Sequence, residues 1–181
     1  MTTYYYLVAS LPSLGAADAP RPTSAVFRAL CSEHLLPADL AEFDLVLSGA
    51  GGSGFARRWR EADATIRNQC ARTRAARLGV DVQPHLRSVK SLDLTLEHRT
   101  REALAAGDPG ERERRLDALR REVLRELAFD SPFGLPAVLA YGIELRILER
   151  QAARDTGRGR DGLSRRIESL LGGNPSPSEQ S

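Results

Sequence analysis

The segment from Asp130 to Arg150 constrains the fold more than any other part of the chain. Its first half is almost wholly apolar and its second half is charged. It opens with a proline that follows two residues favoured as helix N-caps, Asp130 and Ser131. The pattern predicts a helix of about 20 residues, roughly 30 Å long. A helix that is apolar all round is surrounded by protein, so we expect the first half to be buried and the second half to reach solvent or a partner.

Most of the remaining chain also has helical periodicity. Apolar residues recur at steps of three and four between Phe55 and Leu78, which predicts a long amphipathic helix that ends at Gly79. Residues 4–9 fit either a short strand or the start of a buried helix. Further helices are predicted after Thr23 or Ser24, from Pro37, over 86–106 in irregular form, after Asp108-Pro109, and around 163–170. Six to eight helices without a strand pair predict an all-α multi-helix bundle, with a short extended N-terminal segment left open.

Size and composition indicate a globular protein of one domain, or of two small domains that share a core. The chain has 181 residues, and we expect one helical domain over 1–171 followed by a disordered, Gly/Pro/Ser-rich tail over 172–181. The net charge of +2 is too small to demand nucleic acid or acidic lipid as a partner. The first 17 residues carry no charged side chain, but Pro12 interrupts their apolar run, and the other long uncharged stretch, 131–143, has 13 residues and two prolines. A membrane-spanning helix needs roughly 20 residues, so we expect no membrane span. The two cysteines, Cys31 and Cys70, occupy apolar helical positions and are predicted to be free.

No pattern in the sequence predicts a catalytic centre. Gly49–Gly54 matches the dinucleotide motif G-x-G-x-x-G, but no credible strand precedes it, so we interpret it as a connector between helices. The three histidines, His34, His85 and His98, lack the i, i+4 spacing of a zinc-binding helix. We therefore expect no catalytic residue, no metal and no cofactor. An enzyme with a site that the sequence does not reveal remains a third alternative.

Arginines cluster at 57–60, 72–77, 112–115 and 120–125. Acidic residues interleave with them and few aromatic residues accompany them, which argues against a surface that binds nucleic acid. Pairs at helical spacing, such as Glu111 with Arg115, indicate a solvated face. Some arginines on the helix that carries Trp59 are candidates for contact with an acidic protein partner.

Three segments carry a resemblance to a known family. The chain opens with Tyr4-Tyr-Tyr-Leu-Val-Ala-Ser-Leu-Pro12, continues with Trp59–Asn68 and Ala71–Gly79, and closes with Phe133-Gly-Leu-Pro-Ala-Val-Leu-Ala-Tyr141 before a charged stretch. In this order they resemble the C-type central-stalk family of the V/A-type ATPases (the d-type family in eukaryotes), and above all the short C-type-like proteins of bacterial V-type ATPase operons. Ser131 and Gly134 stand where the family usually has Asn and Asp. The chain is also far shorter than the archaeal C-type proteins.

The resemblance implies a non-catalytic central-stalk connector that links the membrane rotor ring to the shaft subunits and supports ion or proton transport. It implies a cytoplasmic protein held at the inner membrane through the ATPase complex. The alternative is a standalone helical adaptor or an arginine-mediated nucleic-acid-binding protein. Our candidates for a partner interface are Arg57, Arg58, Arg60, Arg67, Asn68, Arg74, Glu144, Arg146 and Arg150. Our candidates for a structural role are Trp59, Ile66, Phe133, Leu139 and Tyr141.

Overall fold

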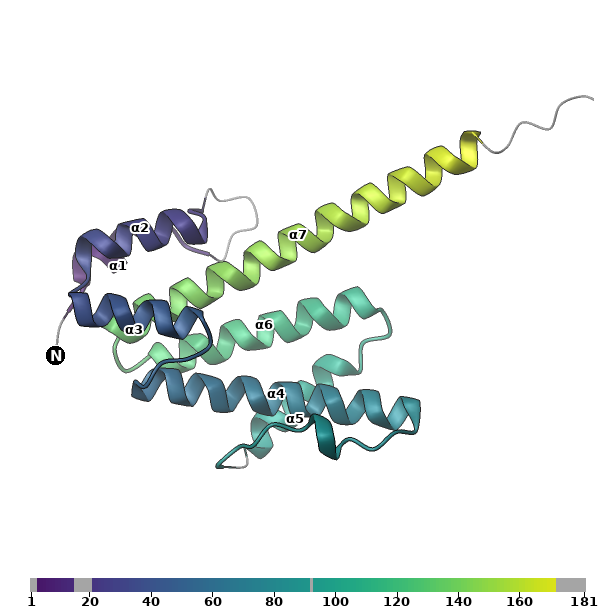
Figure 1. Cartoon of the computed structure of the whole chain (residues 1–181), viewed down its shortest axis with the longest axis horizontal. Helices are drawn as coiled ribbons and strands as arrows, with labels where there is room; N and C mark the ends of the chain where they lie inside the picture. The colour runs from purple at the N-terminus through teal and green to yellow at the C-terminus, as the bar shows by residue number, and fades with distance from the viewer. Residues whose placement is uncertain (1–2, 15–20, 92, 172–181) are drawn as a thin grey trace, which may run out of the picture. The chain divides into compact units, whose positions relative to one another are not determined.

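The computed structural model describes residues 3–14, 21–91 and 93–171, with the backbone alone for 155–171. Over this part of the chain it contains seven α-helices, one short 3-10 helix and no strand (Figure 1). The α-helices are α1 (Tyr5–Ser10), α2 (Ser24–His34), α3 (Pro37–Leu47), α4 (Gly54–Leu78), α5 (Leu94–Leu104), α6 (Pro109–Ala128) and α7 (Leu135–Leu171), and the 3-10 helix is η1 (Gln83–His85). The predicted all-α bundle is confirmed.

Several helix ends lie where local sequence signals placed them. The side chain of Thr23 accepts a hydrogen bond from the amide of Val26 and caps α2. Asp108 caps α6 in the same way, through the amide of Glu111. Gly79 ends α4 in the left-handed conformation, with φ of 65°. These signals involve only residues within one turn of each other, which explains why they can be read from the sequence.

The structure resolves what the sequence left open at the N-terminal end, and it corrects the expected start of the closing helix. Residues 5–10 form α1, the helical one of the two alternatives, and this helix directs Leu7 into the core. The closing helix begins at Leu135 and not beside Asp130 or Ser131. The amide of Gly134 donates to the carbonyl of Ser131 at 3.1 Å, and this turn delays the start of the helix. The helix then runs to Leu171 without interruption, so the separate short helix expected around 163–170 is part of α7.

Residues 86–91 were expected to begin a helix and do not. Helix α5 starts at Leu94 with Asp93 as its cap. The backbone of Arg87 is instead hydrogen-bonded to the side chain of Asn68 on α4. That contact satisfies the amide and carbonyl of Arg87 outside a helix, which is why helical periodicity fails here.

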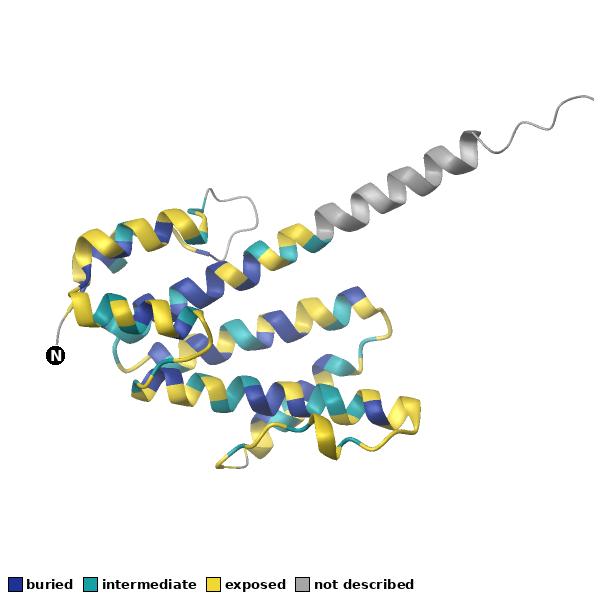
Figure 2. Ribbon diagram, in the orientation of Figure 1, coloured by how far each residue is buried: buried dark blue, intermediate teal, exposed yellow. Residues whose placement is uncertain are grey.

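Two apolar clusters hold residues 1–147 together. Helices α4, α5 and α6 contact one another around Ile66, Leu96, Ala103, Leu116, Leu119 and Val123, with Trp59 packed against them. The second cluster joins α2, α3 and the first half of α7, where the ring of Phe27 lies 5.7 Å from Phe43 and 4.7 Å from Tyr141. In Figure 2 buried residues, in dark blue, lie on the helices that form both clusters. The apolar first half of the segment 130–150 is buried as predicted, with Val138 and Leu139 inaccessible to solvent. Its second half was expected to reach solvent or a partner, but it also contributes buried residues, among them Leu145.

The chain divides into two compact units, residues 1–147 and 148–181, and the boundary falls inside α7. The single domain expected over 1–171 stays a prediction. The expected disordered tail over 172–181 lies outside the described residues. Among the described helices, none combines the length and apolar character that crossing a membrane requires.

Candidate protein-interaction surface

Several arginines of the first unit form ion pairs with carboxylates of the same chain. At the surface, Arg99 of α5 bonds to Glu122 and Glu126 of α6 at 2.6 and 3.0 Å. Other pairs tie α2 to α3, α4 to α5, or neighbouring turns of one helix: Arg28–Asp44, Arg72–Glu97, Arg67–Asp63, Arg114–Glu111 and Arg115–Glu111. These exposed pairs each contribute little to stability, and with the buried pairs they involve 9 of the 19 arginines among residues 1–147.

Two networks of ion pairs are buried. Arg120 of α6 binds Asp117 at 2.9 Å and Asp63 of α4 at 3.4 Å, and the Asp117 side chain is fully buried. Glu144 of α7 accepts hydrogen bonds from Arg121 at 2.6 Å and from Arg125 at 2.8 Å. Glu144 was a candidate for partner contact, and the structure places it in this internal network instead.

One group of cationic side chains surrounds a hollow. This hollow, of about 290 Å³ between α4 and the segment 86–91, is lined by Arg57, Arg60, Glu61, Ser88 and Lys90. Arg60 donates to the backbone carbonyls of Gly51 at 2.8 Å and Ala56 at 3.4 Å, and its charge also contributes to the lowered pKa of the nearby Glu42 carboxylate. Among the described residues, neither Arg57 nor Lys90 forms an ion pair with a carboxylate. We call this group the cationic hollow.

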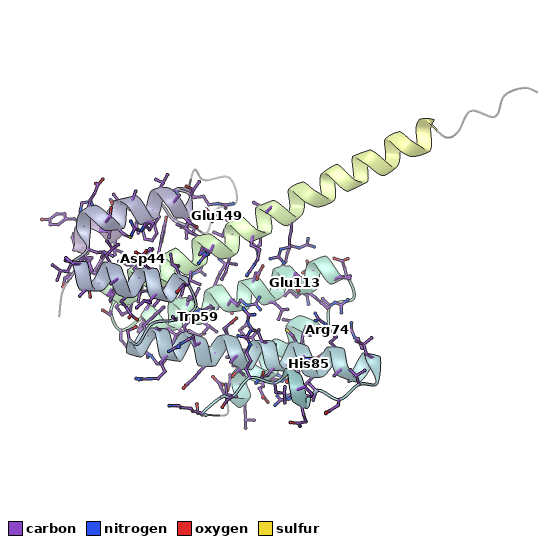
Figure 3. The ribbon with its side chains drawn as sticks, viewed as in Figure 1. Asp44, Trp59, Arg74, His85, Glu113 and Glu149 are labelled. Carbon is purple, nitrogen blue, oxygen red and sulfur yellow. The ribbon has the colours of Figure 1, made fainter. Side chains whose placement is uncertain are left out.

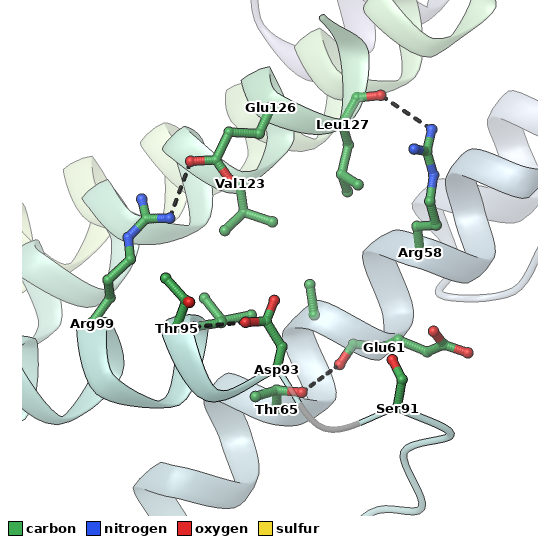
Figure 4. A pocket seen from close by; sticks show the side chains of 12 residues that line it. Arg58, Glu61, Thr65, Ser91, Asp93, Thr95, Arg99, Val123, Glu126 and Leu127 are labelled. Carbon is green, nitrogen blue, oxygen red and sulfur yellow. Dashed lines mark hydrogen bonds and ion pairs between the residues drawn. The ribbon is translucent and has the colours of Figure 1, made fainter. Parts of the chain in front are cut away.

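A second hollow, of about 300 Å³, lies among α4, α5 and α6 (Figure 4). Several of its polar groups are engaged in internal contacts. The guanidinium of Arg58 donates to the carbonyl of Leu127 at 3.3 Å, and Arg99 pairs with Glu126. Asp93 caps α5. The three neighbouring arginines predicted as one interface are therefore divided, because Arg57 and Arg60 line the cationic hollow whereas Arg58 lines the second one.

The other interface candidates do not gather at one place. Arg67 pairs with Asp63 at 2.5 Å, and Asn68 is only 3% exposed. Arg74 lies farther along α4 than Trp59 and is exposed (Figure 3). Arg146 donates to the carbonyl of Leu47, and Arg150 lies in the second unit, where it is exposed.

The structural candidates occupy core or half-buried positions. Ile66 and Leu139 are fully buried, and Trp59 and Tyr141 are partly buried. Burial, with a smaller effect of the nearby Glu144, raises the pKa of Tyr141 to about 12. Phe133 remains 39% exposed, and its ring lies 4.8 Å from that of Tyr5.

Sequence reasoning missed Ser88 and Lys90. Lys90 is the only lysine in the sequence, and an isolated lysine in an arginine-rich chain was the only available signal. Its position opposite Arg57 and Arg60 depends on the contact between Asn68 and Arg87, which no local pattern reveals.

The glycine-rich loop connects α3 to α4, as interpreted from the sequence. The carboxylate of Glu42 accepts hydrogen bonds from the amides of Ser53 at 3.0 Å and Gly52 at 3.3 Å. Burial tends to raise the pKa of Glu42, but these hydrogen bonds outweigh it and hold the pKa below its usual value. Gly51 has φ of 91°, and a Cβ there would lie 2.8 Å from the same carboxylate. An acid of the chain itself therefore occupies amides that a bound phosphate would use.

The opening and closing segments of the resemblance meet in space. The amide of Tyr4 donates to the carbonyl of Phe133 at 2.6 Å. The hydroxyl of Tyr141 donates to the carbonyl of Pro12 at 3.1 Å, across 129 residues of sequence. The N-terminal segment is thus attached to the start of α7 at two separate points.

Comparison with protein-family models, with curated proteins and with solved structures finds no match to this chain. The residues with described side chains contain no cluster of three or more His, Cys, Asp or Glu that could hold a metal ion. The geometry above is therefore the evidence on which functional proposals rest.

Proposed function

We propose that the protein is a non-catalytic central-stalk connector of a bacterial V/A-type rotary ATPase, linking the membrane rotor ring to the shaft subunits during ion transport. One observation carries this proposal. The first and the last of the three segments that resemble the C-type central-stalk family are joined by two hydrogen bonds. The amide of Tyr4 donates to the carbonyl of Phe133, and the hydroxyl of Tyr141 donates to the carbonyl of Pro12. Because residues that contact each other constrain each other, the occurrence of both segments in one chain supports the resemblance more strongly than either segment alone.

The packing of α7 in the first unit suits a part that transmits force. Its buried face contacts the rings of Phe27 and Phe43, and its Glu144 is bound by two arginines of α6. Apolar interiors are close-packed and barely compressible. Buried ion pairs add orientation more than net stability, since their Coulomb energy is largely offset by desolvation. This part of α7 is thereby held against both sliding and rotation.

The same helix also belongs to the second unit. Residues 148–171 continue α7 beyond the first unit, and at about 1.5 Å per residue they correspond to roughly 36 Å of helix. A connector must offer surfaces to at least two partners. A helix shared by two units can provide separate surfaces on one continuous backbone, which supports a linking role.

The proposal is tested by purifying the rotary ATPase from a bacterium that produces the full-length chain with an affinity tag. We expect the nucleotide-binding head of the ATPase to co-purify with the chain in constant proportion. We also expect membranes washed with low-salt EDTA to release the chain together with the head. Recovery of the chain free of ATPase subunits, at native expression level, would refute the proposal.

The excess positive charge of the cationic hollow favours one alternative, a standalone adaptor or nucleic-acid binder that uses its arginines. Titration of the pure protein with a DNA or RNA oligonucleotide at several salt concentrations distinguishes the two functions. Nucleic-acid binding would show a steep salt dependence through counterion release. A connector is expected to show only weak binding that disappears near physiological salt.

A further inference from the structure

We propose that the cationic hollow is a docking site for an acidic segment of a partner protein, one that presents two or more neighbouring carboxylates. The site consists of Arg57, Arg60, Ser88 and Lys90. The inference goes beyond the proposed function, since it identifies the chemistry of a partner and holds whatever complex the chain joins.

The hollow presents donors from two sides. Arg57 and Arg60 are three residues apart on α4, so they lie on one face of the helix. Ser88 and Lys90 belong to the segment on the opposite side of the hollow. A guanidinium can bind a carboxylate through two parallel hydrogen bonds, whereas a lysine ammonium acts as a point charge with three donors. A peptide in the hollow can therefore be held by carboxylates on two of its residues.

The charge of the hollow is only partly balanced by the protein, through Glu61 in its lining and through Glu42, which interacts electrostatically with Arg60. Its lining includes three cationic side chains and one acidic side chain, Glu61. Elsewhere in the first unit, arginines as exposed as Arg28 and Arg114 have carboxylate partners within 3 Å. A concave surface with excess positive charge attracts acidic partners and increases their rate of association.

Both walls of the hollow are held in place before any partner arrives. Arg60 is fixed by the carbonyl of Gly51. The segment that carries Ser88 and Lys90 is fixed by the two hydrogen bonds between Asn68 and Arg87. Preorganisation of this kind lowers the entropy that binding would otherwise cost.

The lining favours a protein carboxylate over nucleic acid. Single-stranded nucleic acids bind to cationic grooves that also offer aromatic rings for base stacking, and the hollow is lined by no aromatic residue among those described. Glu61 in its lining would repel a continuous phosphate backbone. A peptide can bind with its spaced acidic residues placed away from Glu61.

The first test measures binding of fluorescein-labelled octaglutamate to the full-length protein by fluorescence anisotropy. The double variant Arg57→Gln/Lys90→Gln is compared with Arg77→Gln/Arg101→Gln, which removes two exposed arginines outside the hollow and changes the net charge equally. We expect the first variant to lose at least about tenfold in affinity and the control to lose no more than about twofold, because only the first removes direct contacts. Circular dichroism melting curves verify that both variants fold.

A second test uses the native protein and needs no substitution. A carbodiimide activates a glutamate of the bound octapeptide, the amine of Lys90 attacks it to form an amide, and the activating group leaves as a urea. Because Lys90 is the only lysine, mass spectrometry of the tryptic fragment 88–99 identifies the product without ambiguity. We expect coupling at Lys90 to exceed coupling at the N-terminal amine.

Three results would overturn the inference: equal loss of affinity in the two double variants, no coupling at Lys90, or tighter hollow-dependent binding of an oligonucleotide or of inorganic phosphate than of octaglutamate. None of them would affect co-purification with a rotary ATPase. Conversely, absence of the chain from the ATPase would leave peptide binding intact, so the two proposals fail independently.

Discussion

The side-chain amide of Asn68 on α4 forms two hydrogen bonds of 2.8 Å with the backbone of Arg87, donating to its carbonyl and accepting from its amide. The pairing resembles one rung of a β-ladder, with a side chain in place of the second strand. Asn68 is 3% exposed, so water cannot readily replace it. This single residue fixes the segment that forms one wall of the cationic hollow.

Replacing Asn68 with alanine should destabilise the protein by about 1–3 kcal/mol, because the backbone amide and carbonyl of Arg87 lose the buried side chain that pairs them. Urea denaturation measures the loss. The same variant should weaken octaglutamate binding although no charge changes, since Ser88 and Lys90 would no longer be held. Gln83→Ala, at an exposed position of η1, is the control and should alter neither quantity. Unchanged stability of Asn68→Ala would show that the segment is held by other contacts.

Replacing Arg120 with methionine should cost about 3 kcal/mol of unfolding free energy, because the fully buried Asp117 loses its arginine partner. The matched change Arg114→Met removes an exposed pair on the same helix, with Glu111, and should cost at most about 0.5 kcal/mol. Chemical denaturation of both variants gives the comparison. Similar losses in the two would indicate that the Arg120 network behaves as surface charge.

Replacing Gly142 with alanine should destabilise the protein by about 1–3 kcal/mol, through overpacking of the core. The new Cβ would lie 2.8 Å from the ring of Phe43, which is fully buried and has no room to withdraw. The gain in helix propensity, about 1 kcal/mol, is too small to compensate. Gly54→Ala meets no atom within 4 Å and should be neutral or slightly stabilising. Thermal melting distinguishes the two, and a stabilised Gly142→Ala would contradict the packing described.

The contribution of Glu42 should depend on pH. Its folded-state pKa lies below the ordinary value of 4.5, so its stabilising effect is complete above that pH and is lost as the pH falls through the folded pKa. Glu42→Gln should therefore cost about 1.5 kcal/mol at pH 7, the low end for hydrogen bonds to a charged group, and less as the pH falls toward 3. Glu33→Gln, at an exposed site, serves as the control in urea titrations at both pH values. A cost that does not vary with pH would exclude this role for the carboxylate.

The parts of the fold that the sequence predicted are those determined by neighbours in the chain. Thr23, Gly79 and Asp108 mark helix ends through contacts within one turn. The apolar first half of the segment 130–150 was recognised because burial leaves a compositional signature in one continuous segment.

The errors have tertiary causes. Residues 86–91 are not helical because their partner, Asn68, lies 19 residues earlier. Glu144 was placed at a surface, but the arginines that enclose it come from α6. The candidate site was only half predicted for the same reason: Arg57 and Arg60 share a helix, whereas Lys90 reaches them only through the folded chain.

The attachment of Tyr4 to Phe133 has a consequence for synthesis of the protein on the ribosome. The acceptor carbonyl of Phe133 is made long after the donor amide of Tyr4, and at about 5–20 residues per second this delay lasts several seconds or more. Helices α4, α5 and α6 have their own apolar cluster and can assemble during that interval. The nascent N-terminal segment, whose Tyr4 and Leu7 are buried in the folded protein, keeps these side chains exposed until the start of α7 emerges.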